Sequence, residues 1–271
     1  MKVVGLVLNR NCQSLGDSCY DMIAPYCDQT FMLENGSSEG MFAKNSNLFV
    51  KETNGVSWGV NYLFQHALEN TDADIFWLNF NDVGFDCDQK DFYDYALEEI
   101  KNNPRVGIVT AYWDNVWGLS QGRKNTGEEY VSFFDPLTFF ITRSCLENIS
   151  KLDNRLTPFY DSSNFTNHYN GLGPSAALYR LGFKIKTSPK FRVHEVNVYL
   201  EDDKEEKSLD IRGFDDNYWK HELGPKQAID WLDSFFPQLK NTGLNRKQKR
   251  DTIISEICKI STEEDKKNMG L

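Results

Sequence analysis

The chain has 271 residues, 40% of them hydrophobic and 14% aromatic, which supplies enough apolar material for a sizeable core. Its formal net charge of −10 argues against general binding to nucleic-acid backbones, which requires a basic surface that displaces counterions. No stretch reaches the roughly 18 consecutive apolar residues of a transmembrane segment, and no signal-peptide pattern is present. We therefore expect a globular, cytoplasmic protein whose six cysteines, which lack CxxC pairs, are reduced.

The first part of the chain alternates apolar strands with amphipathic helices. Residues 2–8 form a nearly continuous apolar run, which is typical of a strand that is covered on both faces. The spacing of apolar residues then predicts a helix over 14–27, a strand over 31–33, a helix that Ser57 caps and a strand over 75–78. This order predicts an α/β fold with a mostly parallel central sheet.

The later elements continue this alternation and end in a helical tail. They are a helix at 91–103, strands at 105–112 and 137–142, short helices at 144–149 and 174–181, a strand at 183–188, and helices at 224–236 and 246–260. The polar, aromatic stretch 113–130 is predicted to be a loop over a functional site, because long loops in compact domains usually serve function. A charged patch after residue 200 separates a domain of residues 1–200 from a helical appendage of residues 208–271. The basic run 246–250 within that appendage is interpreted as a solvated helix start.

Three segments place polar residues at or beside the ends of consecutive buried strands. They are FMLENGSSEG at 31–40, NGVSWGVNYLFQHAL at 54–68 and DADIFWLNFNDV at 72–83. Open α/β sheets bind their ligands in the crevice beyond the carboxyl ends of the strands. The sequence therefore predicts a nucleotide-type ligand at this edge.

Six motifs in fixed order extend this pattern: LVLNRN, LENGSSEG, NGVSWGVN, FWLNFNDV, FFITRSCLENISKLDNRLTPFY and ALYRLGFKIKTSPKFRVHE. Over residues 2–195 they resemble the glycosyltransferase family 2 type of GT-A domain. The resemblance implies a Rossmann-like GT-A fold that moves a hexose or pentose from a nucleoside-diphosphate sugar to an acceptor hydroxyl. It also implies a divalent cation, Mn²⁺ or Mg²⁺, as cofactor.

By this resemblance, polar residues at the first two strand ends bind the donor. A base and a ribose present hydrogen-bonding groups that need partners when they are buried. Asn9 and Arg10 are assigned to the base, and Glu34, Asn35 and Ser37 to the base and the ribose. Asn54, Trp58 and Asn61 match the segment that closes over the base and the pyrophosphate. The alternative for Asn35 and Ser37 is a plain turn, and the alternative for Trp58 is a core position.

The cation site is expected where the third strand ends. Family members usually carry two acidic residues that bracket one position, and the second binds the cation. This chain has Asn79 and Asn81 there, followed by Asp82. We expect Asp82 and His194 to be the metal ligands and the two asparagines to contact the donor, with Asn79 on the ribose. Because hard cations prefer carboxylates, one carboxylate with amides makes a weaker site than usual.

The catalytic base departs most from the family pattern. Inverting relatives carry an Asp at the position that corresponds to Gly173, nine residues before Gly182, and no carboxylate is present there. A general base must lie within hydrogen-bond reach of the acceptor hydroxyl. Asp161 and Asp135 are the candidates, with His168 as a further one. If none of them serves, the transfer is retaining or the protein is a catalytically inactive binder.

Two other functions stay open from the sequence. A nucleotidyltransferase of related fold would carry a Gly-rich basic loop after the first strand, whereas residues 9–12 read Asn-Arg-Asn-Cys. An inactive nucleotide-sugar-binding protein is supported by the missing base. The acceptor is equally open between a glycan, a lipid-linked sugar, a protein and a modified DNA base, because fold and donor motifs do not encode it.

Overall fold

A computed structural model of the chain describes residues 1–52, 55–113, 130–131, 134, 137–163, 170–196, 223–245, 248–253 and 255–256. Most of the predicted loop 113–130 lies outside the described residues, as do Asn54, Asp135 and His168. Within the described part, no helix is both long enough and apolar enough to cross a membrane.

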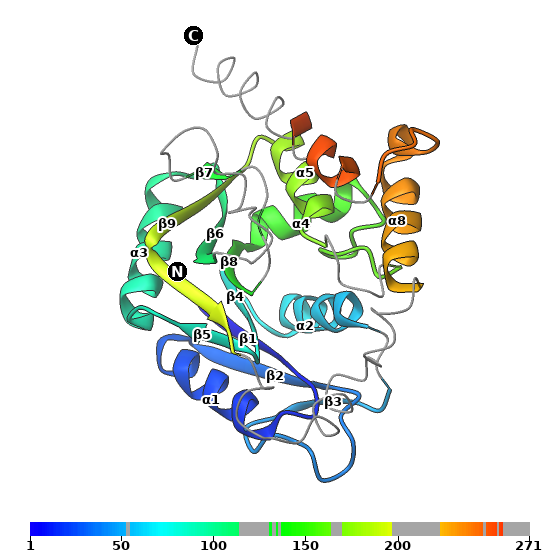
Figure 1. The fold of residues 1–271 in the computed structure, drawn as a ribbon. Coiled ribbons are helices and arrows are strands. Elements are labelled where there is room, and N and C mark those ends of the chain that lie inside the picture. Colours follow the sequence, from blue (N-terminus) through cyan, green and yellow to red (C-terminus); the bar gives the residue numbers. More distant parts are fainter. Residues whose placement is uncertain are drawn as a thin grey trace.

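One mixed sheet runs through the protein in the order β3-β2-β1-β4-β8-β6-β9-β5, with β7 beside β9 (Figure 1). The strands are β1 Val3–Asn9, β2 Gln29–Asn35, β3 Leu48–Val50, β4 Ile75–Phe80, β5 Val83–Phe85, β6 Val106–Trp113, β7 Tyr130–Val131, β8 Thr138–Thr142 and β9 Lys184–Glu195. Of these described strands, β1 to β4, β6 and β9 share one direction, whereas β8 runs antiparallel between β4 and β6. The predicted α/β fold with a mostly parallel sheet is confirmed.

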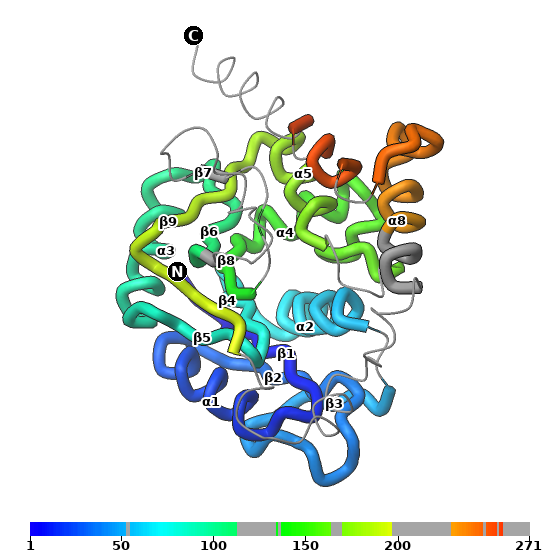
Figure 2. Tube along the Cα trace, viewed as in Figure 1, coloured from blue at the N-terminus to red at the C-terminus, as the bar shows by residue number. Residues whose placement is uncertain are grey.

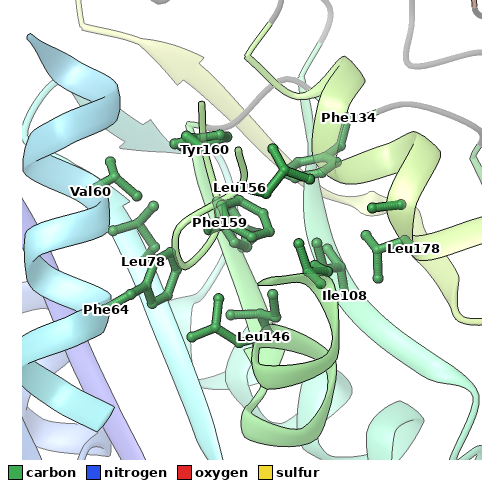
Figure 3. Packing of buried hydrophobic residues seen from close by; sticks show 14 of the residues in the cluster. Val60, Phe64, Leu78, Ile108, Phe134, Leu146, Leu156, Phe159, Tyr160 and Leu178 are labelled. Atoms are coloured by element: carbon green, nitrogen blue, oxygen red, sulfur yellow. The ribbon is translucent and has the colours of Figure 1, made fainter. Parts of the chain in front are cut away.

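Helices cover both faces of this sheet. They are α1 Gln13–Ile23, α2 Val56–Asn70, α3 Gln89–Asn102, α4 Arg143–Leu152, α5 Leu172–Arg180 and α8 Leu223–Phe235, with 3-10 turns at Ala24–Tyr26 and Pro237–Leu239. One apolar cluster lies between the sheet and α1 and α3, and the other between the sheet and α2, α4, α5 and α8. Figure 3 shows the second cluster, in which Phe64 of α2 and Leu78 of β4 approach Phe159. Two buried faces explain why β1 and β4 are apolar throughout most of their length.

Two sequence interpretations are corrected by the described structure. The strand predicted over 183–188 continues to Glu195, because its later half pairs with β5 and with the end of β6. The basic run 246–250 is not a fully solvated helix start, since Lys249 and Arg250 are buried and paired with Asp233 and Asp251. Figure 2 shows α8, in orange, on the same side of the sheet as α4 and α5, and buried α8 residues belong to the same apolar cluster as α5.

Candidate functional site

The carboxyl ends of β1, β2 and β4 bring three of the predicted residues into contact. Asn9 Nδ2 donates to Glu34 Oε1 over 2.9 Å, and Asn81 Nδ2 donates to Asn9 Oδ1 over 2.7 Å. Gly16 of α1 leaves room for the Asn9 amide, because a Cβ at that glycine would lie 2.8 Å from Asn9 Cγ. A hydrogen-bonded chain of side chains therefore crosses three strand ends.

Glu34 is completely buried at the end of β2. Besides Asn9, its carboxylate accepts hydrogen bonds from the hydroxyls of Ser37 and Ser46 and, over 2.8 Å, from the Ala43 amide. The segment between β2 and β3 is thus folded around one carboxylate whose two oxygens are both used within the protein. Glu34 acts on the site by holding this segment, and Ser37 is one of the groups that it holds.

Asn35, the next residue, is also buried but has one unsatisfied atom. Its Nδ2 donates to the Gly55 carbonyl over 3.2 Å, where α2 begins. Its Oδ1 is enclosed and accepts no hydrogen bond from any described group. An unsatisfied buried acceptor costs about 1–3 kcal/mol, and a ligand or water that donates a hydrogen bond to it would remove that cost. The side chain lies against Gly59, where a Cβ would come within 2.8 Å of Asn35 Nδ2.

The turn after β1 is joined to the same segment. The Asn11 amide donates to Ser37 Oγ over 3.0 Å, and the Ser38 amide donates to Asn11 Oδ1 over 2.7 Å. Asn11 adopts φ 52°, a left-handed conformation that asparagine tolerates better than most residues. Arg10 beside it is half-buried, and this burial lowers the pKa of its guanidinium. The site therefore has one cationic side chain at the end of β1.

Trp58 begins an aromatic column along α2. Its ring stacks on Tyr62 at 5.3 Å, and Tyr62 stacks on His66 at 6.4 Å between ring centroids. His66 meets the edge of Phe31 on β2 at 4.7 Å. Trp58 is half-buried, so it is neither a core residue nor a freely exposed ring. The column fixes the orientation of Trp58 over the first turn of α2.

Asn61 joins α2 to the loop that carries Asp161. Its Nδ2 donates to the Tyr160 carbonyl over 2.7 Å and to Ser162 Oγ over 2.9 Å, and its Oδ1 accepts from the Tyr160 amide over 2.8 Å. Asp161 Oδ2 accepts a hydrogen bond from Trp231 Nε1 over 2.9 Å. Asn61 thus orders the loop, and the C-terminal helix α8 orients Asp161. Figure 3 shows Tyr160 beside Val60 of α2.

Asn79 lies inside the sheet. It is completely buried, and its Oδ1 accepts from Thr138 Oγ1 over 2.7 Å, while Trp77 Nε1 donates to the same hydroxyl over 3.0 Å. The side chain is thereby part of a polar contact between β4 and β8. Its amide stabilises the pairing of β4 with an antiparallel neighbour.

The pairing of β5 with β9 brings the backbone of Asp82 near the strand that carries His194. The Val196 amide donates to the Asp82 carbonyl over 2.6 Å, and Gly84 lies opposite His194. His194 Nδ1 is 2.9 Å from Asp86 Oδ1, a carboxylate that the sequence interpretation missed. The Asp82 charge also lies close to Cys19 of α1. Burial, and after it this charge, raise the pKa of the Cys19 thiol.

The described residues do not form a complete cation site by themselves. Among them, no group of three His, Cys, Asp or Glu side chains is arranged to hold a metal ion. The Asp82 backbone pairs with Val196, two residues after His194. Asp82 and His194 are of the residue types that Mn²⁺ and Mg²⁺ bind together with waters and phosphate oxygens.

The strand order and the placement of polar groups at the strand ends define a GT-A-type fold, and known structures agree. No model of a protein family matches the chain, and no curated protein matches it. The structure is similar to GalNAc-T7 with UDP, GalNAc and Mn²⁺, at TM-score 0.55 and 10% identity over 73% of this chain and 44% of that one. It is also similar to the mannosyltransferase PcManGT from Pyrobaculum calidifontis with GDP-Man and Mn²⁺, at TM-score 0.57 and 14% identity over 94% and 69%.

A third similar structure is S. aureus TarS 1-349 in complex with UDP-GlcNAc, at TM-score 0.51 and 13% identity over 99% of this chain and 74% of that one. At these identities the likeness establishes the fold, and the chain therefore has the GT-A fold. It spans less than half of the GalNAc-T7 chain.

Proposed function

We propose that the protein is a glycosyltransferase that takes a hexose or pentose from a nucleoside-diphosphate sugar. The unsatisfied Oδ1 of Asn35 carries this proposal, because it is a buried acceptor beside the start of α2 and is suited to an N–H group of a nucleobase. Trp58, which is oriented by its aromatic column, offers a flat surface for the base. The UDP, GDP-Man and UDP-GlcNAc of the similar structures support a donor of this class.

Asp82 and His194 would hold Mn²⁺ or Mg²⁺ in this proposal. The cation would neutralise the charge that develops on the diphosphate as the bond to the sugar breaks. Arg10 adds a positive charge at the end of β1. Two of the similar structures contain Mn²⁺, which supports the same choice of ion here.

Asp161 is the proposed general base among the described candidates. It would accept the proton of the acceptor hydroxyl while that oxygen bonds to the sugar carbon and the diphosphate leaves. The position that corresponds to the usual base, Gly173, has no room for a carboxylate, since a Cβ there would lie 2.9 Å from Phe235. Trp231 Nε1 orients Asp161 and leaves its carboxylate half-exposed. Asp135 remains a second candidate.

An inactive nucleotide-sugar-binding protein is the alternative. It is favoured by the closed position at Gly173 and by the two asparagines of the acidic motif, whose amides already bond to protein atoms. The two functions differ in turnover, because both require the donor pocket but only the transferase cleaves the donor.

The test is a calorimetric binding series with UDP-sugars and GDP-sugars, with and without Mn²⁺. We expect Asn35→Ala to weaken binding of the preferred donor about tenfold or more, because a buried hydrogen bond to the base is lost. The matched control, Asn70→Ala, removes an exposed amide at the far end of α2 and should bind like the wild type. Unchanged affinity in Asn35→Ala, or no donor binding by the wild type, would refute the proposal. Binding without donor hydrolysis or transfer would favour the inactive binder.

A further inference from the structure

The carboxylate of Asp161 is held at both of its oxygens. Oδ1 accepts a hydrogen bond from the Ser163 amide over 2.9 Å, within the same loop, and Oδ2 accepts one from Trp231 Nε1 over 2.9 Å. The second donor lies 70 positions further along the chain, in α8. Asp161 is half-exposed, and a carboxylate can accept about four hydrogen bonds. These two bonds therefore fix the carboxylate and leave room for a substrate hydroxyl.

The backbone of the same loop is held from the other side. Leu156 forms an antiparallel bridge with Asp161, and Leu156, Phe159 and Tyr160 are buried in the core beside α2 (Figure 3). Asn61 Oδ1 accepts hydrogen bonds from the amides of Phe159 and Tyr160 over 3.2 and 2.8 Å. The backbone before Asp161 is thus fixed by α2, whereas its carboxylate is fixed by α8.

The loop also lies next to the helix that contributes to the proposed donor pocket. The first turn of α2 carries Trp58, and the Gly55 carbonyl just before it accepts the hydrogen bond from Asn35. Asn61 follows Gly55 by less than two turns of α2, which is about 9 Å along the helix axis. A ligand that begins at Asn35 and extends along α2 therefore reaches the loop that carries Asp161.

The indole of Trp231 is almost enclosed by its own helix and the core. The side chain is 7% exposed, and its ring lies 5.2 Å from that of Phe235 and 6.4 Å from that of Phe236 between centroids. Arg155 holds Phe235 in turn by donating to its carbonyl over 3.1 Å. A buried indole N–H usually requires an acceptor, and Asp161 supplies it. A purely structural contact would serve only this need of Trp231.

We propose that Trp231 is a positioning residue for the transfer step, which holds the Asp161 carboxylate in the direction in which it accepts a proton. This inference rests on the proposed function, in which Asp161 is the general base. In that step the acceptor oxygen bonds to the sugar carbon, the bond from this carbon to the diphosphate breaks, and the hydroxyl proton passes to Asp161. Displacement of a reacting group by about 1 Å can lower a rate about 100-fold. Helix α8 thereby takes part in the chemistry of the domain that precedes it.

Hydrolysis of a nucleotide sugar, with water as the acceptor, tests this role in the 271-residue chain. The probe is the UDP-sugar or GDP-sugar that binds most tightly in the calorimetric series. Trp231→Phe keeps an aromatic ring and loses the N–H donor, whereas Trp231→His keeps a ring N–H and fills less of the core. We expect Trp231→Phe to lower kcat about 10- to 100-fold with an unchanged Kd for the donor. Trp231→His should retain more of kcat than Trp231→Phe, although it is less stable. A purely structural contact predicts the opposite order, because activity would then follow stability.

A double variant shows whether Trp231 acts through Asp161. Asp161→Asn removes the base and should lower kcat by about 10²- to 10⁴-fold. Adding Trp231→Phe to it should cause no further loss, because the effects of residues that act as a unit are not additive. Trp77→Phe is the matched control. It loses an indole hydrogen bond of 3.0 Å to Thr138 in the other apolar cluster and should keep the kcat of the wild type.

The inference is overturned if Trp231→Phe keeps the wild-type kcat, if Trp77→Phe loses as much, or if the losses of the two single variants add up in the double variant. Failure of the proposed function has a different signature. A wild type that binds no nucleotide sugar refutes the donor, and one that binds it without turnover favours the inactive binder; either result also removes the role of Trp231. Turnover that is lost in Asp161→Asn but unchanged in Trp231→Phe supports the proposed function and overturns this inference alone.

Discussion

Glu34 and Asn35 are consecutive residues of β2 that are both buried, yet their polar atoms are used differently. Alternation along the strand turns Glu34 towards the α1 face and Asn35 towards α2. The Glu34 carboxylate accepts four hydrogen bonds from protein groups, whereas Asn35 Oδ1 accepts none from the described residues. The sequence resemblance assigns both residues to the ligand. Their hydrogen bonds favour a structural role for Glu34 and a binding role for Asn35.

Asp153 gives a prediction about acid stability. The hydrogen bonds from Arg155, at 2.9 Å from Nε and 2.5 Å from Nη2, lower the pKa of Asp153. A carboxyl whose folded-state pKa is depressed stabilises the protein above its unfolded-state pKa of about 3.9 and loses that contribution as the pH falls through the folded-state value. Asp153→Asn should therefore lower the free energy of unfolding at pH 7 by about 1 kcal/mol.

Urea unfolding of wild type and Asp153→Asn between pH 7 and pH 2 measures this difference. It should shrink towards zero at the acid end of the series. Asp72→Asn is the control, because Asp72 forms a fully exposed pair with Lys2 and should show no measurable loss. A difference that stays constant with pH would show that the charge of Asp153 is not its source.

At the scale of elements, the strands with long apolar runs could be predicted from the sequence, whereas the pairing of β5 with β9 could not. β1 and β4 follow from their apolar composition, and α2 begins one residue before the predicted cap. β5 has three residues, one of which is a glycine, so it carries no periodic signal. The extension of β9 contains Pro189 and charged residues, which obscure a strand. The contact of Asp86 with His194 depends on this unpredicted pairing, which explains why the sequence indicated His194 and missed Asp86.

Gly59 tests how closely α2 must approach β2. A Cβ at this position would lie 2.8 Å from Asn35 Nδ2 and 2.8 Å from Leu8 Cδ1. Although alanine favours a helix more than glycine does, Gly59→Ala should displace the start of α2 and destabilise the protein by about 1–3 kcal/mol. Donor affinity should fall further than in a variant that is equally destabilised elsewhere, such as Ile149→Val in the buried face of α4.

Denaturation and donor titration of these two variants separate fold from site. If Gly59→Ala is as stable as the wild type and binds the donor equally well, the close approach of helix and strand is not needed for the pocket. A loss of donor affinity shared equally by Ile149→Val would instead reflect general loosening of the core.

At the scale of the whole molecule, helix α8 packs into the same apolar cluster as helices of the sheet domain. Trp231, Leu232 and Phe235 of α8 are buried in the cluster that also contains α2, α4 and α5. Arg155 lies over the Phe235 ring at 3.9 Å and donates to the Phe235 carbonyl over 3.1 Å. The predicted appendage is therefore packed on the domain through its described part, and through Trp231 it reaches a candidate catalytic residue.

Phe235→Ala tests whether sheet and C-terminal helix unfold together. Loss of this buried ring, which also contacts Trp231 and Phe236, should lower the free energy of unfolding by about 3–5 kcal/mol. Phe49→Ala is the matched control, because its ring is 54% exposed on β3 and should change stability by at most about 0.5 kcal/mol. If α8 is part of one cooperative unit, circular dichroism and tryptophan fluorescence will report a single, shifted transition in Phe235→Ala. Two separate transitions would show instead that α8 detaches while the sheet stays folded, and Asp161 would then lose its orientation before the fold is lost.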